Sequence, residues 1–501
     1  MALNFSAPAQ AADWQFTPSV GASVTYTDNI NQAASNPQDG LIFSVSPGFS
    51  LNSKGSRRVQ ASMNYNLSSV ARFSDDNTTD LLHNLGAIGK AELIEDFLFV
   101  DGTASVSQSQ ISLFGSSADA ATNASNRANT AVYSIAPYVQ KRFGTFATAQ
   151  ARYALGGSTF GGNAATSDSV TNAFSASLIS GTRFNDLSWA LDYSLRKAEN
   201  DTATDTTFER ATLTLGYALT RKFRVFGSVG QDENDFLSST NSGGSSYSVG
   251  IGWAPTQRTS LEASAGERYF GSTFSLSARH RTRMSNWTVR YYEDVSDITQ
   301  QTLEQTGRIF WVCNGALEET PDNNPPQTAC PTTWAGPILA GQLASYYSSH
   351  GFTNAALVAA NLLDVGIANG VYVIKSLTAG VTWDWKRFGW GLSASDTTRI
   401  YQFAAGVEDH AQSVSGTANY RLSPRTTANA GLSLTKNSGT GGLVGGSGRN
   451  DDLVSLNLGM NHEFARDLSG ALTFRHQQRD SDAVNSDYEE NSLGASVSMR
   501  F

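Results

Sequence analysis

The feature that most constrains this chain is an alternation of apolar with small or polar residues that recurs along nearly its whole length. From Phe16 onward, runs of about 10–13 residues alternate in this way before turn residues interrupt them. In residues 19–26, for example, Val20, Ala22 and Val24 lie on one face, and Ser, Gly and Thr residues lie on the other. A period of two residues predicts β-strands with one apolar face.

The connections between these runs alternate in length. Short turns such as Glu95-Asp96 and Asn185-Asp186 are followed by longer polar loops such as 109–126 and 437–450. Counting the intervening segments gives about 22 strands, within a range of roughly 18–24. Strands of about ten residues with short turns at one end and long loops at the other are typical of outer-membrane barrels. We therefore predict an all-β fold, a single antiparallel transmembrane β-barrel in the bacterial outer membrane, in contact with its lipid and lipopolysaccharide.

Composition agrees with this interpretation and excludes other classes. Only 16% of the residues are charged, against about 25% in an average soluble protein, yet the mean hydropathy is −0.28. No apolar run reaches the roughly 18 residues of a membrane-spanning helix. The net charge of −9, with 35 Lys and Arg residues spread along the chain, excludes nucleic acid as a partner. A propeller would repeat every 40–50 residues or so, and no such repeat is present.

Both ends of the chain carry signals of export. Residues 1–12 end in Ala9-Gln10-Ala11-Ala12, a pattern that precedes a signal-peptidase site, so we interpret them as the residual end of a signal peptide or a disordered terminus. The barrel then spans residues 13–501. The last strand ends in alternating apolar residues: Leu493, Ala495, Val497, Met499 and Phe501. This ending resembles the strand that barrel-assembly machinery recognises, and it places the long loops outside the cell and the short turns in the periplasm.

One segment, residues 299–369, breaks the alternation. The topology makes it a long external loop, and it contains two helix-like runs, Ile338–Ser349 and Thr353–Val365. Three interpretations remain open: a constriction or plug in the barrel mouth, a self-packed helical hairpin that caps the surface, and a contact for a partner.

Both cysteines of the chain, Cys313 and Cys330, lie in this insertion. They have no second cysteine pair and no nearby histidine that would complete a zinc site. We predict a single disulfide, which would contribute about 3 kcal/mol in the chain-entropy model; the alternative is two unpaired thiols.

The sequence contains no motif that indicates catalysis. The six histidines are scattered, and none lies in an HExxH, a GxSxG or another metal-ligand spacing. We therefore predict no enzymatic activity, no metal site and no cofactor.

The most pointed cluster of charge lies between residues 262 and 294. At a period of two, Arg279, Arg281 and Arg283 share the inner face of one strand. Neighbouring strands place further residues on that face, namely Arg268 and Arg290 with Glu262 and Asp294 as carboxylate partners. We call the five arginines the basic stripe. Two interpretations remain open: a selectivity element for anionic solutes or polysaccharide carboxylates, and a structural lattice of ion pairs.

Aromatic residues flank this cluster. We predict that they belong to the membrane-interface girdle rather than to sugar-stacking platforms: Tyr269, Phe270, Trp287 and Tyr291.

Two passages resemble a known family. Residues 18–30 with Pro47-Gly48-Phe49, and residues 266–276 continuing to Asp294, are similar to bacterial outer-membrane β-barrels associated with the PEP-CTERM/exosortase system and exopolysaccharide gene clusters. The resemblance implies a link to exopolysaccharide export, with periplasmic export proteins and a polysaccharide as partners, and carries over no functional residue. We expect a porin-like channel that works passively. The alternatives are a general diffusion or nutrient-uptake porin, a non-conducting structural barrel, and a barrel enzyme.

Overall fold

The computed structural model describes most of the chain. The described residues are 13–54, 58–75, 77–110, 114, 126–161, 167–236, 238, 242–301, 309–313, 316–320, 335–339, 370–440 and 448–501.

The strands follow the alternating segments of the sequence. The first half of the barrel consists of β1 (Asp13–Thr27), β2 (Gly40–Lys54), β3 (Val59–Phe73), β4 (Thr78–Ile94), β5 (Leu98–Gln110), β6 (Arg127–Phe143), β7 (Ala147–Phe160), β8 (Ser169–Ser180), β9 (Leu187–Asn200), β10 (Thr206–Thr220) and β11 (Phe223–Asp235). The second half consists of β12 (Gly244–Thr256), β13 (Thr259–Arg268), β14 (Gly271–Arg281), β15 (Ser285–Asp297), β19 (Val371–Trp385), β20 (Phe388–Tyr401), β21 (Glu408–Ser423), β22 (Thr426–Gly439), β23 (Arg449–Glu463), β24 (Leu468–Ser481) and β25 (Tyr488–Arg500). The insertion contributes β16 (Ile309–Cys313), β17 (Ala316–Thr320) and β18 (Ala335–Leu339).

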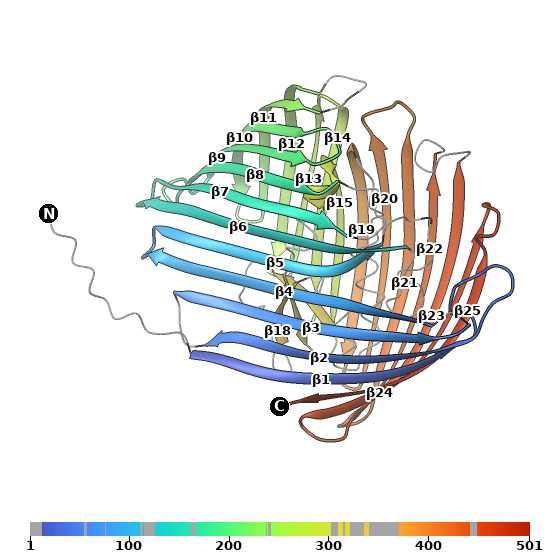
Figure 1. Cartoon of the computed structure of the whole chain (residues 1–501). Helices are drawn as coiled ribbons and strands as arrows, with labels where there is room; N and C mark the ends of the chain where they lie inside the picture. Colours follow the sequence, from blue (N-terminus) through green and yellow to red (C-terminus); the bar gives the residue numbers. More distant parts are fainter. Residues whose placement is uncertain are drawn as a thin grey trace.

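The main sheet is a closed barrel. It has 22 antiparallel strands, and β1 pairs with β25 in the register Ser19↔Arg500 to Thr27↔Ser492. β15 pairs directly with β19, so the insertion lies outside the barrel sheet. Closure satisfies the backbone polar groups of every strand, which is what a hydrocarbon environment requires. The predicted fold and the predicted number of strands are confirmed. In Figure 1 the strands of the near wall run at a steep angle to those of the far wall. Strand β1 begins at the same end of the barrel where β25 finishes.

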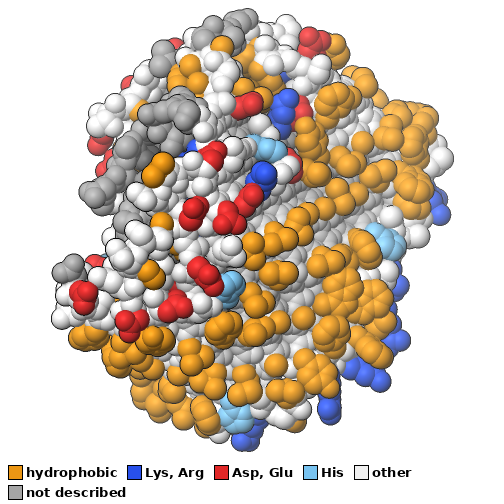
Figure 2. Space-filling model, turned by 90° about the vertical axis from the view of Figure 1, so that its right-hand side faces the viewer, with side chains coloured by type: hydrophobic (Ala, Val, Ile, Leu, Met, Phe, Trp, Pro, Cys, Tyr) orange, Lys and Arg blue, Asp and Glu red, His pale blue; other side chains and the backbone are white. Residues whose placement is uncertain are grey.

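The outer face of the barrel is an apolar belt. Outward positions carry exposed side chains such as Val249, at 67%, and Leu493, at 60%. Figure 2 shows this belt between acidic side chains on one side and basic side chains along the opposite edge. Of the residues expected in the aromatic girdle, Trp287 is 48% exposed on the outer face.

Tyr269 and Phe270 are a correction to that expectation. They form the β13–β14 turn, and they pack against a cluster of Phe236, Val295 and Val373 instead of facing lipid. The reason is that β15 and β19 continue beyond this turn at the extracellular end and offer it an apolar surface. Burial also raises the pKa of the Tyr269 hydroxyl.

The described part of the insertion is a three-stranded antiparallel sheet in the order β17-β16-β18. Trp311 of β16 and Leu339 of β18 pack on Ile88 of β4. Ile88 alternates with the lipid-facing Leu81 and Leu93, so it points into the barrel, and Figure 1 shows β18 behind β3 and β4.

The first helix-like run is corrected at its start. Ile338 belongs to β18, paired with Phe310 of β16, because strand pairing competes with the local helical pattern there. The remainder of that run, the run at 353–365 and the pairing of Cys313 with Cys330 lie outside what the structure describes. Among the described residues, no helix has the length and apolar character needed to cross a membrane.

Candidate channel lining

The inner faces of β4, β5 and β6 form one side of the lumen, which we call the covered wall. Many of its inward side chains in the upper part of the barrel are buried, including Ser105 at 3%, Val132 at 5% and Ile88 at 7%. Trp311 and Leu339 of the insertion cover Ile88. The insertion therefore occupies space inside the barrel on this side.

The inner faces of β13, β14, β15 and β19 form a second side, which we call the open wall. Exposed inward residues are Glu262, Ser275, Ser277, Arg279, Thr288, Arg290, Thr378 and Thr382. Cross-strand pairs set this face, since Ser277 lies opposite both Glu262 and Arg290. Hydroxyl and charged side chains that remain exposed on an inner face make this side of the lumen accessible to water.

Arg268, the extracellular end of the basic stripe, is fixed by two carboxylates. Its Nη1 donates to Oδ1 of Asp294 at 2.6 Å, and its Nη2 donates to Oδ1 of Asp232 at 2.9 Å. Asp232 is 1% exposed and also lies 3.7 Å from Nε of Arg210. Arg268 further stacks over the Phe270 ring at 5.0 Å. These contacts occupy the guanidinium group, which favours a structural role at this end.

The rest of the basic stripe is arranged differently. Arg290 is exposed and lies over the Tyr292 ring at 5.1 Å, and no ion pair of Arg290 or Arg281 is seen among the described residues. Glu262 pairs with Arg224 of β11 instead of with an arginine of the stripe. Arg279 and Arg281 point inward near the periplasmic end of β14, which ends at Arg281.

Arg283 is a correction, because it does not lie on the inner face of a strand. It falls in the β14–β15 turn, where it is exposed at the periplasmic rim. The alternation of faces stops at Arg281, and so does the inference from period two.

Sequence reasoning missed the ion pairs at the extracellular mouth. On β20 and β21, Nε and Nη2 of Arg399 donate to the two carboxylate oxygens of Asp409 at 2.8 and 2.7 Å. Both side chains are nearly fully buried, at 3% and 4% exposure, and the Tyr401 hydroxyl donates to the same carboxylate. The only available signal was that Arg399 and Asp409 each fall at an inward position of the alternation, and this does not reveal that they pair with each other.

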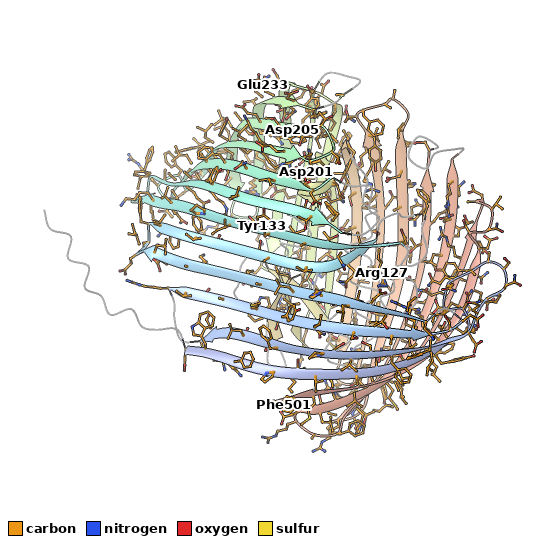
Figure 3. The ribbon with its side chains drawn as sticks, in the orientation of Figure 1. Arg127, Tyr133, Asp201, Asp205, Glu233 and Phe501 are labelled. Carbon is orange, nitrogen blue, oxygen red and sulfur yellow. The ribbon has the colours of Figure 1, made fainter. Side chains whose placement is uncertain are left out.

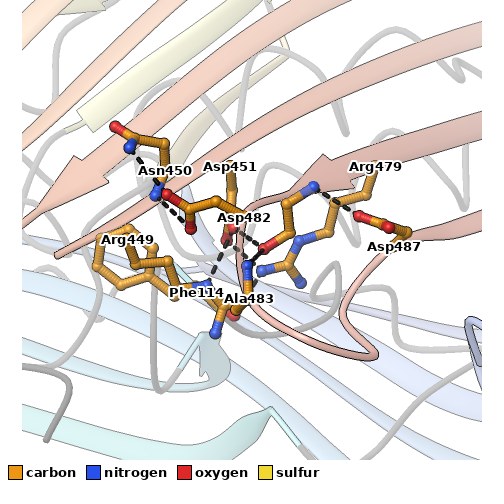
Figure 4. A network of polar contacts seen from close by, with 9 residues as sticks. Phe114, Arg449, Asn450, Asp451, Arg479, Asp482, Ala483 and Asp487 are labelled. Atoms are coloured by element: carbon orange, nitrogen blue, oxygen red, sulfur yellow. Dashed lines mark hydrogen bonds and ion pairs between the residues drawn. The ribbon is translucent and has the colours of Figure 1, made fainter. Parts of the chain in front are cut away.

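A second missed network is centred on Asp451 (Figure 4). Asp451 accepts from Nε of Arg449 at 3.0 Å, and also from Arg479 and from the Ser481 hydroxyl. Arg479 donates in addition to the backbone carbonyl of Phe114, which belongs to the β5–β6 connection. The Phe114 ring lies against Arg449 at 5.7 Å and is 8% exposed. A residue that follows the covered wall is thus held by β23 and β24.

The neighbouring β24–β25 loop is held by hydrogen bonds. Asp482 accepts from the backbone N–H of Asn450 at 3.0 Å and from its side-chain amide at 2.9 Å. These two bonds lower the pKa of the Asp482 carboxyl, because they stabilise its charged form. The extracellular ends of β23 and β24, and the loop that follows β24, are therefore joined by polar contacts.

The C-terminal strand, β25, closes the barrel by pairing with β1, and its last residues lie at the opposite end of the barrel from these networks. Leu493, Val497 and Met499 are exposed on the outer face, and the Phe501 N–H donates to the carbonyl of Pro18 at 3.0 Å. Figure 3 shows Phe501 at the end opposite Asp201, Asp205 and Glu233. Within the described residues, no group of three or more His, Cys, Asp or Glu side chains is placed to hold a metal ion.

Neither a protein-family model nor a curated protein sequence matches the chain. Solved structures do match it. One is the siderophore receptor PirA from Acinetobacter baumannii, with a TM-score of 0.50 at 9% identity over 97% of this chain and 80% of that one. The chain is an outer-membrane β-barrel. PirA from Pseudomonas aeruginosa (TM-score 0.46, 11% identity, 97% and 80% covered) and OccAB4 from A. baumannii (0.36, 10%, 99% and 100%) also match.

Proposed function

We propose that this outer-membrane barrel is a passive channel for polar solutes, connected with the export of exopolysaccharide. The observation that carries the proposal is the open wall, where Ser277, Thr288 and Arg290 are exposed on the inner face. Hydroxyl and guanidinium groups replace part of a solute's hydration as it passes, and they do so without any chemical step. The driving force would come from synthesis at the inner membrane.

The insertion would narrow this path from one side. Trp311 and Leu339 are held against Ile88 of the covered wall, and Phe114 is held by Arg479 of β24. A solute would therefore pass between the insertion and the open wall. This arrangement supports the interpretation of residues 299–369 as a constriction over that of a hairpin confined to the outer surface.

Single-channel conductance in planar bilayers tests the channel. We expect the wild-type barrel to conduct weakly and a variant lacking residues 299–369 to conduct several-fold more. Retained heat-modifiable migration on gels would show that the variant is folded. A folded barrel that stays closed with and without the insertion would refute the channel and favour a structural barrel.

The export role needs a separate test. In a strain that lacks this gene, we expect less polymer on the cell surface and unchanged uptake of small nutrients. Normal surface polymer with slowed nutrient uptake would instead identify a diffusion porin. The link to export rests on the sequence resemblance, so its failure would leave the conductance result unaffected.

A further inference from the structure

The charged residues of the turns and loops are segregated by the two ends of the barrel. Exposed cations occupy most of the periplasmic turns: Arg58, Arg183, Arg221, Lys222, Arg258, Arg283, Lys386, Arg387, Arg425 and Arg466. We call this set the basic collar. Acidic residues in the same turns are fewer: Glu95, Asp96, Asp186 and Asp467.

The extracellular loops show the opposite sign. Their described residues include Asp28, Asp39, Asp75, Asp168, Asp201, Asp205, Asp482 and Asp487, and among those described residues there is no Lys or Arg. Figure 3 shows Asp201 and Asp205 at the end away from Phe501. The net charge of −9 thus conceals a barrel with one acidic end and one basic end.

Apart from Arg58, the cations of the basic collar are available to a ligand. Arg58 pairs with Glu95 at 3.1 Å. For the remaining members, no ion pair is found within the part of the chain that the structure describes. A cation on the tip of a tight turn without an internal partner keeps its field directed outward.

Aromatic rings lie beside these cations and face lipid. In the β19–β20 turn, Lys386 and Arg387 are bracketed by Trp385, at 57% exposure, and Phe388, at 40%. Further exposed rings adjoin other turns of the collar: Trp253, Phe464, and Phe146, which packs on Phe184 of the turn that contains Arg183. Aromatic side chains prefer the interface between hydrocarbon and headgroups, so the cations beside them lie at the level of the headgroups.

We propose that the basic collar binds anionic phospholipid headgroups of the inner leaflet of the outer membrane, such as phosphatidylglycerol. Two observations favour a lipid over a soluble periplasmic partner. The cations follow the circumference of the barrel instead of gathering on one side, and several of their turns adjoin lipid-facing rings. Arg and Lys near a membrane surface attract anionic lipid, and the attraction weakens with salt.

Lipid retention measured by native mass spectrometry tests this assignment. The wild-type barrel, released from nanodiscs that contain equal phosphatidylglycerol and phosphatidylcholine, is expected to retain phosphatidylglycerol several-fold over phosphatidylcholine. A quadruple variant removes the charge of two collar turns: Arg221→Gln, Lys222→Gln, Lys386→Gln, Arg387→Gln. Its ratio of retained phosphatidylglycerol to phosphatidylcholine is expected to be about fivefold lower than that of the wild type. The double variant Lys386→Gln, Arg387→Gln, which changes only the β19–β20 turn and leaves the other collar turns untouched, is expected to show a smaller loss.

The matched control changes charge at the other end. Asp201→Asn with Asp205→Asn is expected to leave the lipid preference unchanged. Equal retention of the two lipids by the wild type, or an unchanged preference in both collar variants, would overturn the proposal. So would collar variants that keep their lipid preference but no longer bind soluble polyglutamate, because that result would assign the collar to an acidic soluble partner. The test is independent of whether the barrel conducts.

Discussion

On the covered wall Ile88 lies beneath Trp311 and Leu339, whereas on the open wall Ser277 and Arg290 are exposed to the lumen. Both walls consist of strands with the same alternation of faces. They differ because the insertion packs on one of them, so an inward position is a core position on β4 and a solvated position on β14. In a barrel, the alternation along a strand decides which side chains face the lumen instead of the lipid. Contacts across the lumen then decide which of these inward side chains are exposed to water.

The largest effect on stability is expected at Arg268, at the extracellular end of the open wall, where the inward side chains become buried. Arg268→Ala removes the partner of Asp232, which is 1% exposed. Among the described residues, the buried carboxylate then keeps only Arg210, at 3.7 Å, and loses both hydrogen bonds from Arg268, which is expected to cost about 3 kcal/mol of unfolding free energy. Urea unfolding in lipid vesicles measures it.

The exposed pair between Arg58 and Glu95 serves as the control for Arg268→Ala. Arg58→Ala is expected to cost less than about 1 kcal/mol. Equal effects of the two substitutions would show that the Arg268 pairs are not structural.

On the covered wall, Ile88→Ala is expected to cost about 2–3 kcal/mol, because it opens a cavity beneath Trp311 and Leu339. Chemical unfolding followed by tryptophan fluorescence measures the loss. The conservative change Ile88→Val should cost about 1 kcal/mol. If Ile88→Ala left stability unchanged, the insertion would not be anchored on this wall.

Phe114→Ala tests the contact between the covered wall and β23. Loss of the buried ring and its stacking on Arg449 is expected to loosen the mouth and to raise the frequency of brief open events in single-channel records. A large loss of stability without altered gating would make Phe114 a packing residue only.

The smallest effect is expected from the solvated part of the basic stripe. Arg279→Ala, Arg281→Ala and Arg290→Ala together should reduce the preference for anions over cations by about two- to threefold, since these charges sit in water where screening is strong. Reversal potentials in a salt gradient measure this ratio. An unchanged ratio would support the structural interpretation of the whole stripe.

Much of the fold was predictable because a barrel wall depends on local pattern. The period of two placed Glu262, Arg279 and Arg290 on the inner face, and counting the segments between connections predicted the strand number. The pattern failed where a strand ended, as at Arg283, and where tertiary packing competed with local signals, as at Tyr269 and Ile338.

The candidate site was less predictable, for a geometric reason. Arg268 on β13 meets Asp232 on β11 across an intervening strand whose inner positions are small, such as Ser246 and Ser248. Arg479 meets Phe114 although they are 365 positions apart in the chain. Such partners depend on the curvature of the sheet and on how loops cross the lumen, neither of which is encoded in a local period.

The sequence by itself determined a closed outer-membrane barrel and the face of each strand residue, because lipid on one side and water on the other impose a strict alternation. Only the tertiary structure decided which arginines are fixed by carboxylates and which remain solvated, and which wall the insertion covers. The physical reason is that these choices depend on groups brought together across the lumen, where burial and pairing, and not neighbours in the chain, set the energy of a charge.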